Sequence, residues 1–160
     1  MNSRVVPREV LLLVAVISMF CWCSNAVHDN RSAVVVVDGQ VSLGQHREDV
    51  GRRLEQQNFQ RSKMASEELF YSQELAQDLR CKYNDRGTLE KAKGDFTVLN
   101  VGRIKLSSGA TIDEVRQLLG EPTKITRVGH GVENHYYDQF RLHLIFSRQK
   151  ASRFVLGAED

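Results

Sequence analysis

The segment Gly109–Pro122 reads GATIDEVRQLLGEP, and it decides how the rest of the chain is interpreted. A threonine three residues before a glutamate is typical of a capping box, in which the side chains of Thr111 and Glu114 bond to each other's backbone amides. The apolar residues that follow recur at helical spacing, namely Ile112, Val115, Leu118 and Leu119. Gly120 suits the left-handed residue that ends a helix, and Pro122 prevents its continuation. The sequence therefore predicts a helix over residues 112–119.

After this helix the hydrophobic period changes to two. Residues 124–128 and 133–138 flank a Gly-His-Gly tip, which predicts a hairpin. Residues 141–146 alternate so that Leu142, Leu144 and Phe146 share one face, and residues 152–156 can return as a partner strand. This half of the chain is therefore predicted to be a helix followed by an antiparallel meander that packs one face on the helix.

The first half of the chain carries a fainter version of the same order of elements. Val35–Leu43 resembles Val98–Leu106, Glu48–Gln57 predicts a short helix, and the pair Phe70-Tyr71 matches Tyr136-Tyr137. We therefore expect an α+β fold of tandem helix-plus-antiparallel-meander units that share a core. Residues 34–97 form the first, degenerate unit in this interpretation, and residues 98–160 form the second.

Two parts of the first half are less clear. Asp38-Gly39 lies between the apolar runs 34–37 and 40–43, and such a dipeptide predicts a β-hairpin. Residues 60–67 carry little pattern, and residues 68–80 fit either a helix or a strand, although the repeat favours a strand for part of them.

The N-terminal residues have the pattern of an export signal. Arg4 and Arg8 precede an uncharged run over Val10–Cys23, and Ser24-Asn25-Ala26 offers small residues for cleavage. We expect a signal peptide over residues 1–26 and a linker over residues 27–33, which predicts a periplasmic or secreted protein. An uncleaved anchor and a lipid anchor on Cys21 or Cys23 remain open, although the residues before these cysteines do not match bacterial lipid-attachment sites.

The cysteine count fits an exported domain without an intrachain disulfide. Cleavage after residue 26 leaves Cys81 as the one cysteine of the mature chain. We expect a buried small hydrophobe at this position, and a domain held together by its core alone.

Residues Val98–Val155 resemble the SmpA/OmlA, or BamE-like, domains of the cell envelope. The matching segments are Val101–Ile104, Gly109–Thr111, Glu114-Val115, Leu118–Pro122, Tyr136-Tyr137 and Leu142–Phe146. The resemblance implies a helix followed by a three-stranded antiparallel sheet, and β-lactamase-inhibitor-like proteins carry two such units in tandem. It also implies a protein partner at the envelope and a role in outer-membrane or envelope assembly.

Composition and motifs exclude several classes of function. The chain has 22 Lys+Arg and 20 Asp+Glu, so its net charge of +2 gives no electrostatic footprint for nucleic acid. A hydrophobic fraction of 41% is too high for a disordered chain. The sequence contains neither a G-x-S-x-G nucleophile elbow nor a phosphate-binding glycine loop, so we expect no enzyme and no cofactor.

Two groups of residues are candidate sites. A three-residue turn over Asp138–Phe140 would set His135 opposite His143, with Glu133 on the same face, and such a set could hold Zn²⁺ although no standard spacing is met. In each aromatic pair one ring is expected in the core and the other outside. The partner-binding candidates are therefore Tyr71, Tyr137, Phe140 and Arg141.

The sequence favours an exported, non-enzymatic protein–protein interaction module of the cell envelope that works through its sheet face. The alternative is a secreted inhibitor of an extracellular enzyme, and the third hypothesis is a metal-binding protein centred on His135 and His143. Contact with a membrane is expected only through an uncleaved signal or a lipid anchor.

Overall fold

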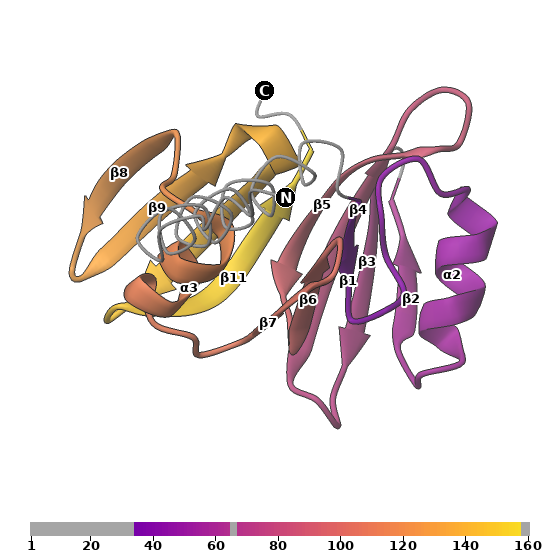
Figure 1. The fold of residues 1–160 in the computed structure, drawn as a ribbon. Helices are drawn as coiled ribbons and strands as arrows, with labels where there is room; N and C mark the ends of the chain where they lie inside the picture. The colour runs from indigo at the N-terminus through magenta and orange to yellow at the C-terminus, as the bar shows by residue number, and fades with distance from the viewer. Residues whose placement is uncertain (1–33, 65–66, 158–160) are drawn as a thin grey trace, which may run out of the picture. The chain divides into compact units, whose positions relative to one another are not determined.

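Two antiparallel sheets and two α-helices make up residues 34–64 and 67–157, which the computed structural model describes (Figure 1). In the first part of the chain the elements are β1 (Val35–Val37), α2 (Arg47–Glu55), β2 (Gln60–Lys63), β3 (Glu67–Ser72), β4 (Gln77–Tyr83) and β5 (Leu89–Asp95). The second part contains β6 (Val98–Val101), β7 (Ile104–Ser107), α3 (Ile112–Leu119), β8 (Lys124–Gly129), β9 (Val132–Tyr137), the 3₁₀ turn η2 (Asp138–Phe140), β10 (Leu142–Ser147) and β11 (Lys150–Leu156).

The larger sheet has the strand order β2-β3-β4-β5-β11-β10-β9-β8. It consists of two four-stranded meanders, β2–β5 and β8–β11, which join where β5 pairs with β11 from Ala92↔Leu156 to Asp95↔Arg153. Gly94 lies in this join. Its position requires glycine, because a Cβ there would collide with the backbone carbonyl of Asp78 on β4. Helix α2 precedes the first meander in the sequence, and α3 precedes the second.

The smaller sheet, in the order β1-β6-β7, lies over the first meander (Figure 1). Its pairing corrects the predicted hairpin at Asp38-Gly39, because β1 pairs with β6 rather than with residues 40–43. Val37 and Val41 form only an isolated bridge after the turn. The Asp38 carboxylate accepts the backbone amides of Thr97 (3.0 Å) and Val98 (2.7 Å), which ties the end of β1 to the start of β6.

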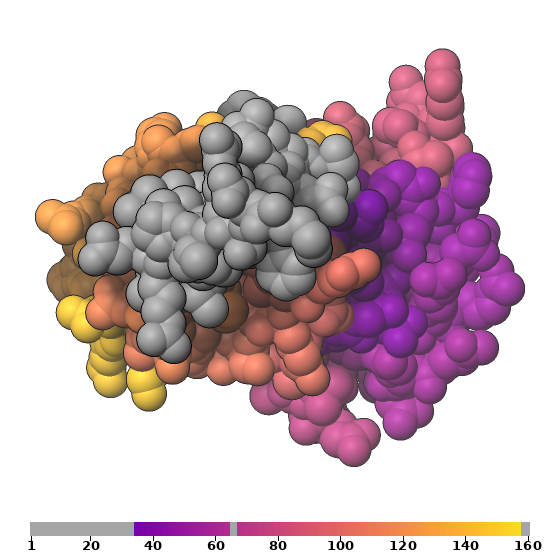
Figure 2. Space-filling view, viewed as in Figure 1, coloured from indigo at the N-terminus to yellow at the C-terminus, as the bar shows by residue number. Residues whose placement is uncertain are grey.

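One hydrophobic core lies between the larger sheet and the elements that cover it. The largest fully buried apolar side chains are Tyr137, Phe70, Phe146, Phe154, Leu99, Leu106, Leu144 and Leu156. Helix α2 contributes Val50 and Leu54, and α3 contributes Val115 and Leu119. Full burial of one such side chain stabilises the fold by about 1.5–3 kcal/mol. Figure 2 shows the same side as Figure 1, with the violet residues of α2 at the surface.

The predicted α+β class is wrong, because the described residues are predominantly β. The two helices have nine and eight residues, whereas β1–β11 form two antiparallel sheets, one of them with eight strands. Polar segments such as β2 (QRSK) and β5 (LEKAKGD) form strands because neighbouring strands supply partners for their backbone groups. The helix-plus-meander description therefore omits much of the strand content.

The expected helix over residues 112–119 is confirmed as α3. The Thr111 amide donates to Glu114 Oε2 (2.7 Å), and the Glu114 amide donates to Thr111 Oγ1 (3.3 Å), which completes the capping box. Gly120 follows with a φ of 85°, a value that favours glycine.

The predicted signal peptide over residues 1–26, the linker over residues 27–33, and the candidate lipid-attachment residues Cys21 and Cys23 lie outside the described residues. Over residues 34–64 and 67–157, no helix is long and apolar enough to cross a membrane. The division of the fold between residues 97 and 98 stays a prediction.

Candidate binding surfaces

The larger sheet has one face in the core and one face in contact with solvent. Successive side chains of a strand point to opposite faces, and directly paired residues share a face, so the register assigns each side chain. We call the second face the open face. It carries Glu67, Leu69, Tyr71, Asp78, Arg80, Lys82, Lys91, Lys93, Asp95, Arg153, Val155, His143, Ile145, Asn134, Tyr136, Lys124 and Thr126.

Apolar and aromatic side chains lie on both meanders of the open face, on β3, β9, β10 and β11. Leu69, Ile145 and Val155 are half-buried, and Tyr71 is 44% exposed. On the second meander the ring of Tyr136 stacks on His143 with a centroid distance of 4.3 Å, and Lys124 Nζ lies 5.0 Å from the centre of the Tyr136 ring. The open face thus combines rings, aliphatic side chains and cations, a mixture that protein interfaces favour.

The charges of the open face are predominantly positive. Six basic side chains stand against the three acidic side chains of Glu67, Asp78 and Asp95. Arg153 binds two of these carboxylates, with Nη2 2.9 Å from Asp78 Oδ1 and Nε 3.2 Å from Asp95 Oδ1. Partial burial, followed by the neighbouring Asp78, raises the pKa of Asp95.

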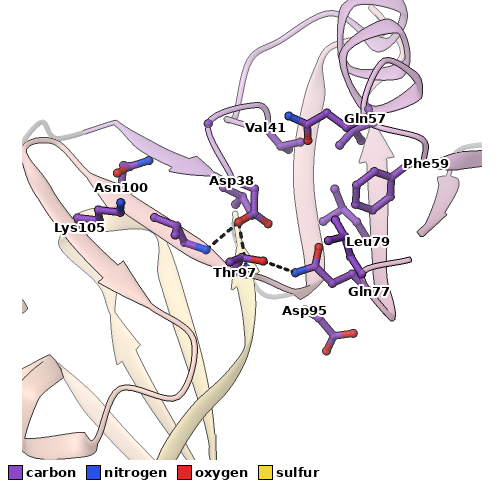
Figure 3. Close-up of a pocket in the computed structure, with 15 residues that line it drawn as sticks. Asp38, Val41, Gln57, Phe59, Gln77, Leu79, Asp95, Thr97, Asn100 and Lys105 are labelled. Carbon is purple, nitrogen blue, oxygen red and sulfur yellow. Dashed lines mark hydrogen bonds between the residues drawn. The ribbon is translucent and has the colours of Figure 1, made fainter. Parts of the chain in front are cut away.

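A pocket of about 400 Å³ lies on the other side of the larger sheet, between the smaller sheet, the end of α2 and β4 (Figure 3). Its apolar wall contains Val41, Leu54, Phe59 and Leu79. At its polar edge, Gln77 Nε2 donates a hydrogen bond to Thr97 Oγ1 at 2.7 Å. The pocket could hold one apolar side chain or a small ligand with few polar groups.

Two residues of the pocket lining, Asp38 and Asp95, carry carboxylates, and both carboxylates have structural partners. Asp38 Oδ1 accepts two backbone amides of the β5–β6 connection, and burial raises the pKa of this carboxyl group. Asp95 is bound by Arg153. The lining residues include no cysteine, histidine or serine, and the hydroxyl oxygen of Thr97 accepts a hydrogen bond from Gln77.

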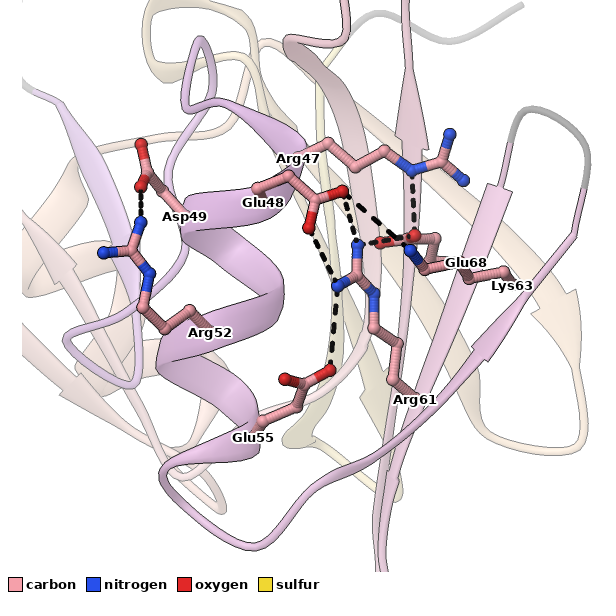
Figure 4. A network of polar contacts seen from close by, with 8 residues as sticks. All are labelled: Arg47, Glu48, Asp49, Arg52, Glu55, Arg61, Lys63 and Glu68. Carbon is pink, nitrogen blue, oxygen red and sulfur yellow. Dashed lines mark hydrogen bonds and ion pairs between the residues drawn. The ribbon is translucent and has the colours of Figure 1, made fainter.

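A network of charged residues fastens α2 to β2 and β3 (Figure 4). The buried carboxylate of Glu68 accepts both Arg47 Nε and Arg61 Nη2 at 2.8 Å through its Oε1 atom. Arg61 also lies 3.4 Å from Glu48 and 3.6 Å from Glu55 of the helix, and its hydrogen bond lowers the pKa of Glu48. A Cβ at Gly51 would collide with the Arg61 guanidinium, so this helical glycine makes room for the network.

The metal candidates are not brought together. The connection from β9 to β10 has four residues, because Arg141 follows η2 with a φ of 50°. His135 therefore pairs with Leu144, and His143 pairs with Tyr136, which places the two histidines on opposite faces. Glu133 does reach His135, with Oε2 3.2 Å from Nε2. Within residues 34–64 and 67–157, no group of three or more His, Cys, Asp and Glu side chains could hold a metal ion.

The four partner-binding candidates fall into different environments. Tyr71 is exposed on the open face, and Arg141 is exposed in the turn before β10. Tyr137 and Phe140 are buried, and burial raises the pKa of Tyr137 to about 12. The extra turn residue exchanges the roles of Tyr136 and Tyr137, so that Tyr136 is the ring on the open face.

Sequence reasoning missed the basic residues of β4 and β5. A signal existed for β4, because Leu79, Cys81 and Tyr83 alternate and are buried, which leaves Arg80 and Lys82 on the opposite face. For β5 the sequence LEKAKGD gave no comparable signal. Its strand is defined by its pairing with β4 and β11.

Comparisons with known proteins add little to this geometry. No protein-family model matches the chain, and no curated protein matches it. A solved structure with some similarity is a DUF4309 family protein (YjgB) from Bacillus subtilis, at 15% identity and a TM-score of 0.38, over 61% of this chain and 68% of that chain. A likeness at this level carries no argument about fold or function, and the resemblance to BamE-like domains stays a prediction.

Proposed function

We propose that this protein is a non-enzymatic binding module that contacts another protein through the open face of its eight-stranded sheet. The proposed setting is the cell envelope or the space outside the cell, where the module assists envelope assembly. The sequence pattern of residues 1–26 supports export, and the resemblance of residues 98–155 to BamE-like domains supports the envelope.

The observation that carries this proposal is the composition of the open face. The solvated face of an antiparallel sheet is ordinarily polar, because its strands alternate apolar and polar residues. Here Leu69, Ile145 and Val155 lie on that face, and the rings of Tyr71 and Tyr136 flank them. Aliphatic and aromatic side chains set among cations on a solvated face are typical of a protein interface.

Position-specific photo-cross-linking tests the proposal. A photoreactive residue would replace Tyr71 or Ile145 on the open face in one set of variants. In the control set it would replace Arg53 of α2 or Gln117 of α3, which are exposed on elements that cover the other face. All four variants would be irradiated in intact cells of the source organism.

We expect an adduct of one defined mass from both open-face positions and none from the control positions. The captured protein, once purified, should form a 1:1 complex with the unmodified chain. Equal labelling from all four positions, or no adduct from Tyr71 and Ile145, would overturn the proposal.

A further inference from the structure

Four basic residues lie together on the open face, on the neighbouring strands β4 and β5. The register places Arg80 directly opposite Lys93, and Lys82 directly opposite Lys91. Like charges directly opposite each other on one face of a sheet are destabilising. The electrostatic repulsion between these paired cations therefore opposes folding at this position.

The carboxylates of the open face relieve this arrangement only in part. Glu67 lies opposite Lys82 in the register of β3 and β4. Asp78 and Asp95 are bound by Arg153, at distances of 2.9 and 3.2 Å. In the part of the chain that the structure describes, neither Arg80 nor Lys93 has an ion-pair partner, and both side chains are exposed.

The neighbours of this pair indicate what kind of anion would fit. Along the same row, Leu69 pairs with Arg80, and Val155 pairs with Lys93, so the two cations lie between aliphatic side chains. The carboxylates of Asp78 and Asp95 border the row and would repel a continuous polyanion such as nucleic acid. Separate carboxylates set among apolar groups, as on a protein surface, avoid that repulsion.

We infer that the partner of the open face is a protein that presents acidic side chains to Arg80 and Lys93. This inference rests on the proposed function and specifies the chemistry of the partner. The carboxylates of the partner would neutralise the paired cations, while its apolar groups would contact Leu69 and Val155. Opposite charges of this kind fix the register of a complex and speed its association.

Titration of the labelled protein with a spaced-glutamate peptide, in which serine and leucine separate the glutamates, followed by NMR, tests the inference. We expect amide shifts that concentrate at Arg80 and Lys93 and remain small at Arg53 and Arg103, which are exposed outside the open face. The double variant R80E/K93E should weaken this binding by about ten-fold. The control variant R53E/R103E, with the same change of net charge, should weaken it by less than about two-fold.

Thermal unfolding separates lost binding from lost structure. The single variant R80E places a carboxylate opposite Lys93, which replaces a like-charge pair by an opposite-charge pair. Its Tm should therefore equal or exceed that of the parent, while its binding of the spaced-glutamate peptide falls. A Tm that falls together with binding, or equal effects of R80E/K93E and R53E/R103E, would overturn the inference.

Two further probes distinguish other anions. A short single-stranded DNA and vesicles of equal parts phosphatidylserine and phosphatidylcholine should bind more weakly than the spaced-glutamate peptide at equal charge. Tighter binding of either would overturn the assignment to an acidic protein. If cross-linking from Tyr71 persists unchanged in R80E/K93E, this inference is overturned and the proposed function stands. If the parent protein gives no adduct at all, the proposed function itself is overturned.

Discussion

The two helices are attached to the sheet in physically different ways. Helix α2 lies over β2 and β3 through a charged network in which Glu68 is fully buried between Arg47 and Arg61. Both helices also bury apolar side chains, but α3 relies on Val115 and Leu119, and its first turn is closed by Thr111 and Glu114. A buried ion pair must overcome the desolvation of its charges, whereas apolar packing has no such cost.

This difference shows where each attachment is sensitive. Removing one partner of a buried ion pair leaves an uncompensated charge, so the α2 contact should fail abruptly. The attachment of α3 depends on several separate interactions, namely its apolar packing and its capping box. Removing any one of them should therefore lower the free energy of unfolding only modestly. Four predictions test that contrast, beginning with the largest expected effect.

Glu68→Ala should destabilise the fold by about 3–5 kcal/mol, because Arg61 would remain in a nearly buried position without its closest carboxylate. Urea unfolding measures this loss. The matched change in the second meander is Glu133→Ala, which removes a partly exposed carboxylate from His135 and should cost clearly less than Glu68→Ala. Equal losses in the two variants would contradict the contrast.

Gly51→Ala should destabilise the protein by about 1 kcal/mol, although the same change in an ordinary helix stabilises by about that amount. The reason is the collision of the new methyl group with the Arg61 guanidinium, which Glu68 holds in place. In an Arg61→Ala background, Gly51→Ala should become stabilising. A double-mutant cycle by urea unfolding measures this reversal, and an unchanged sign would show that the glycine has another role.

Thr111→Ala should cost about 1 kcal/mol at pH 7, because the α3 capping box is lost. Hydrogen bonds from Thr111 lower the pKa of Glu114 below its ordinary value of 4.5. A depressed pKa in the folded state gives stability that is present above the ordinary pKa and lost as the pH falls through the folded one. The difference in the free energy of unfolding between parent and variant, measured with urea, should therefore shrink from pH 7 to pH 3. A difference that stays constant over this range would show that the Glu114 carboxylate does not contribute to it.

His46→Asp should stabilise the protein by about 0.5 kcal/mol, the smallest effect of the four. His46 is the N-cap of α2, has extended backbone, and makes no capping hydrogen bond through its side chain. Aspartate can accept the amides of the first turn, as Thr111 does in α3. Thermal unfolding of His46→Asp and of the control His46→Ala measures the gain, which should be absent in the control.

The contrast between the helices also explains which elements the sequence predicts. Helix α3 is described by local signals, namely the cap, the apolar spacing and Gly120, and its bounds are confirmed. Residues 60–63 of β2 carry little pattern, because Arg61 faces the core through its ion pairs instead of through apolar burial. A buried charge removes the periodicity on which sequence interpretation depends.

The predicted sites depended on the register between β9 and β10. One extra residue in the turn between these strands moves each side chain to the opposite face of the sheet. Arg141 adopts a positive φ without being glycine or asparagine, so the sequence does not reveal the longer turn. That extra residue separates His135 from His143 and exchanges Tyr136 with Tyr137. The cation pair of Arg80 and Lys93 requires the pairing of β4 with β5, a long-range fact that neither strand contains alone.

The position of β11 has a consequence for how the chain acquires its structure. This strand follows all other described strands in the sequence, yet it lies between β5 and β10 in the middle of the larger sheet. Until residues 150–156 have been synthesised, β5 and β10 both lack the strand that pairs with them. The pairing of β5 with β11, which joins the two meanders, cannot form before then. The larger sheet therefore closes only after β11, the last of its strands in the sequence, has been made.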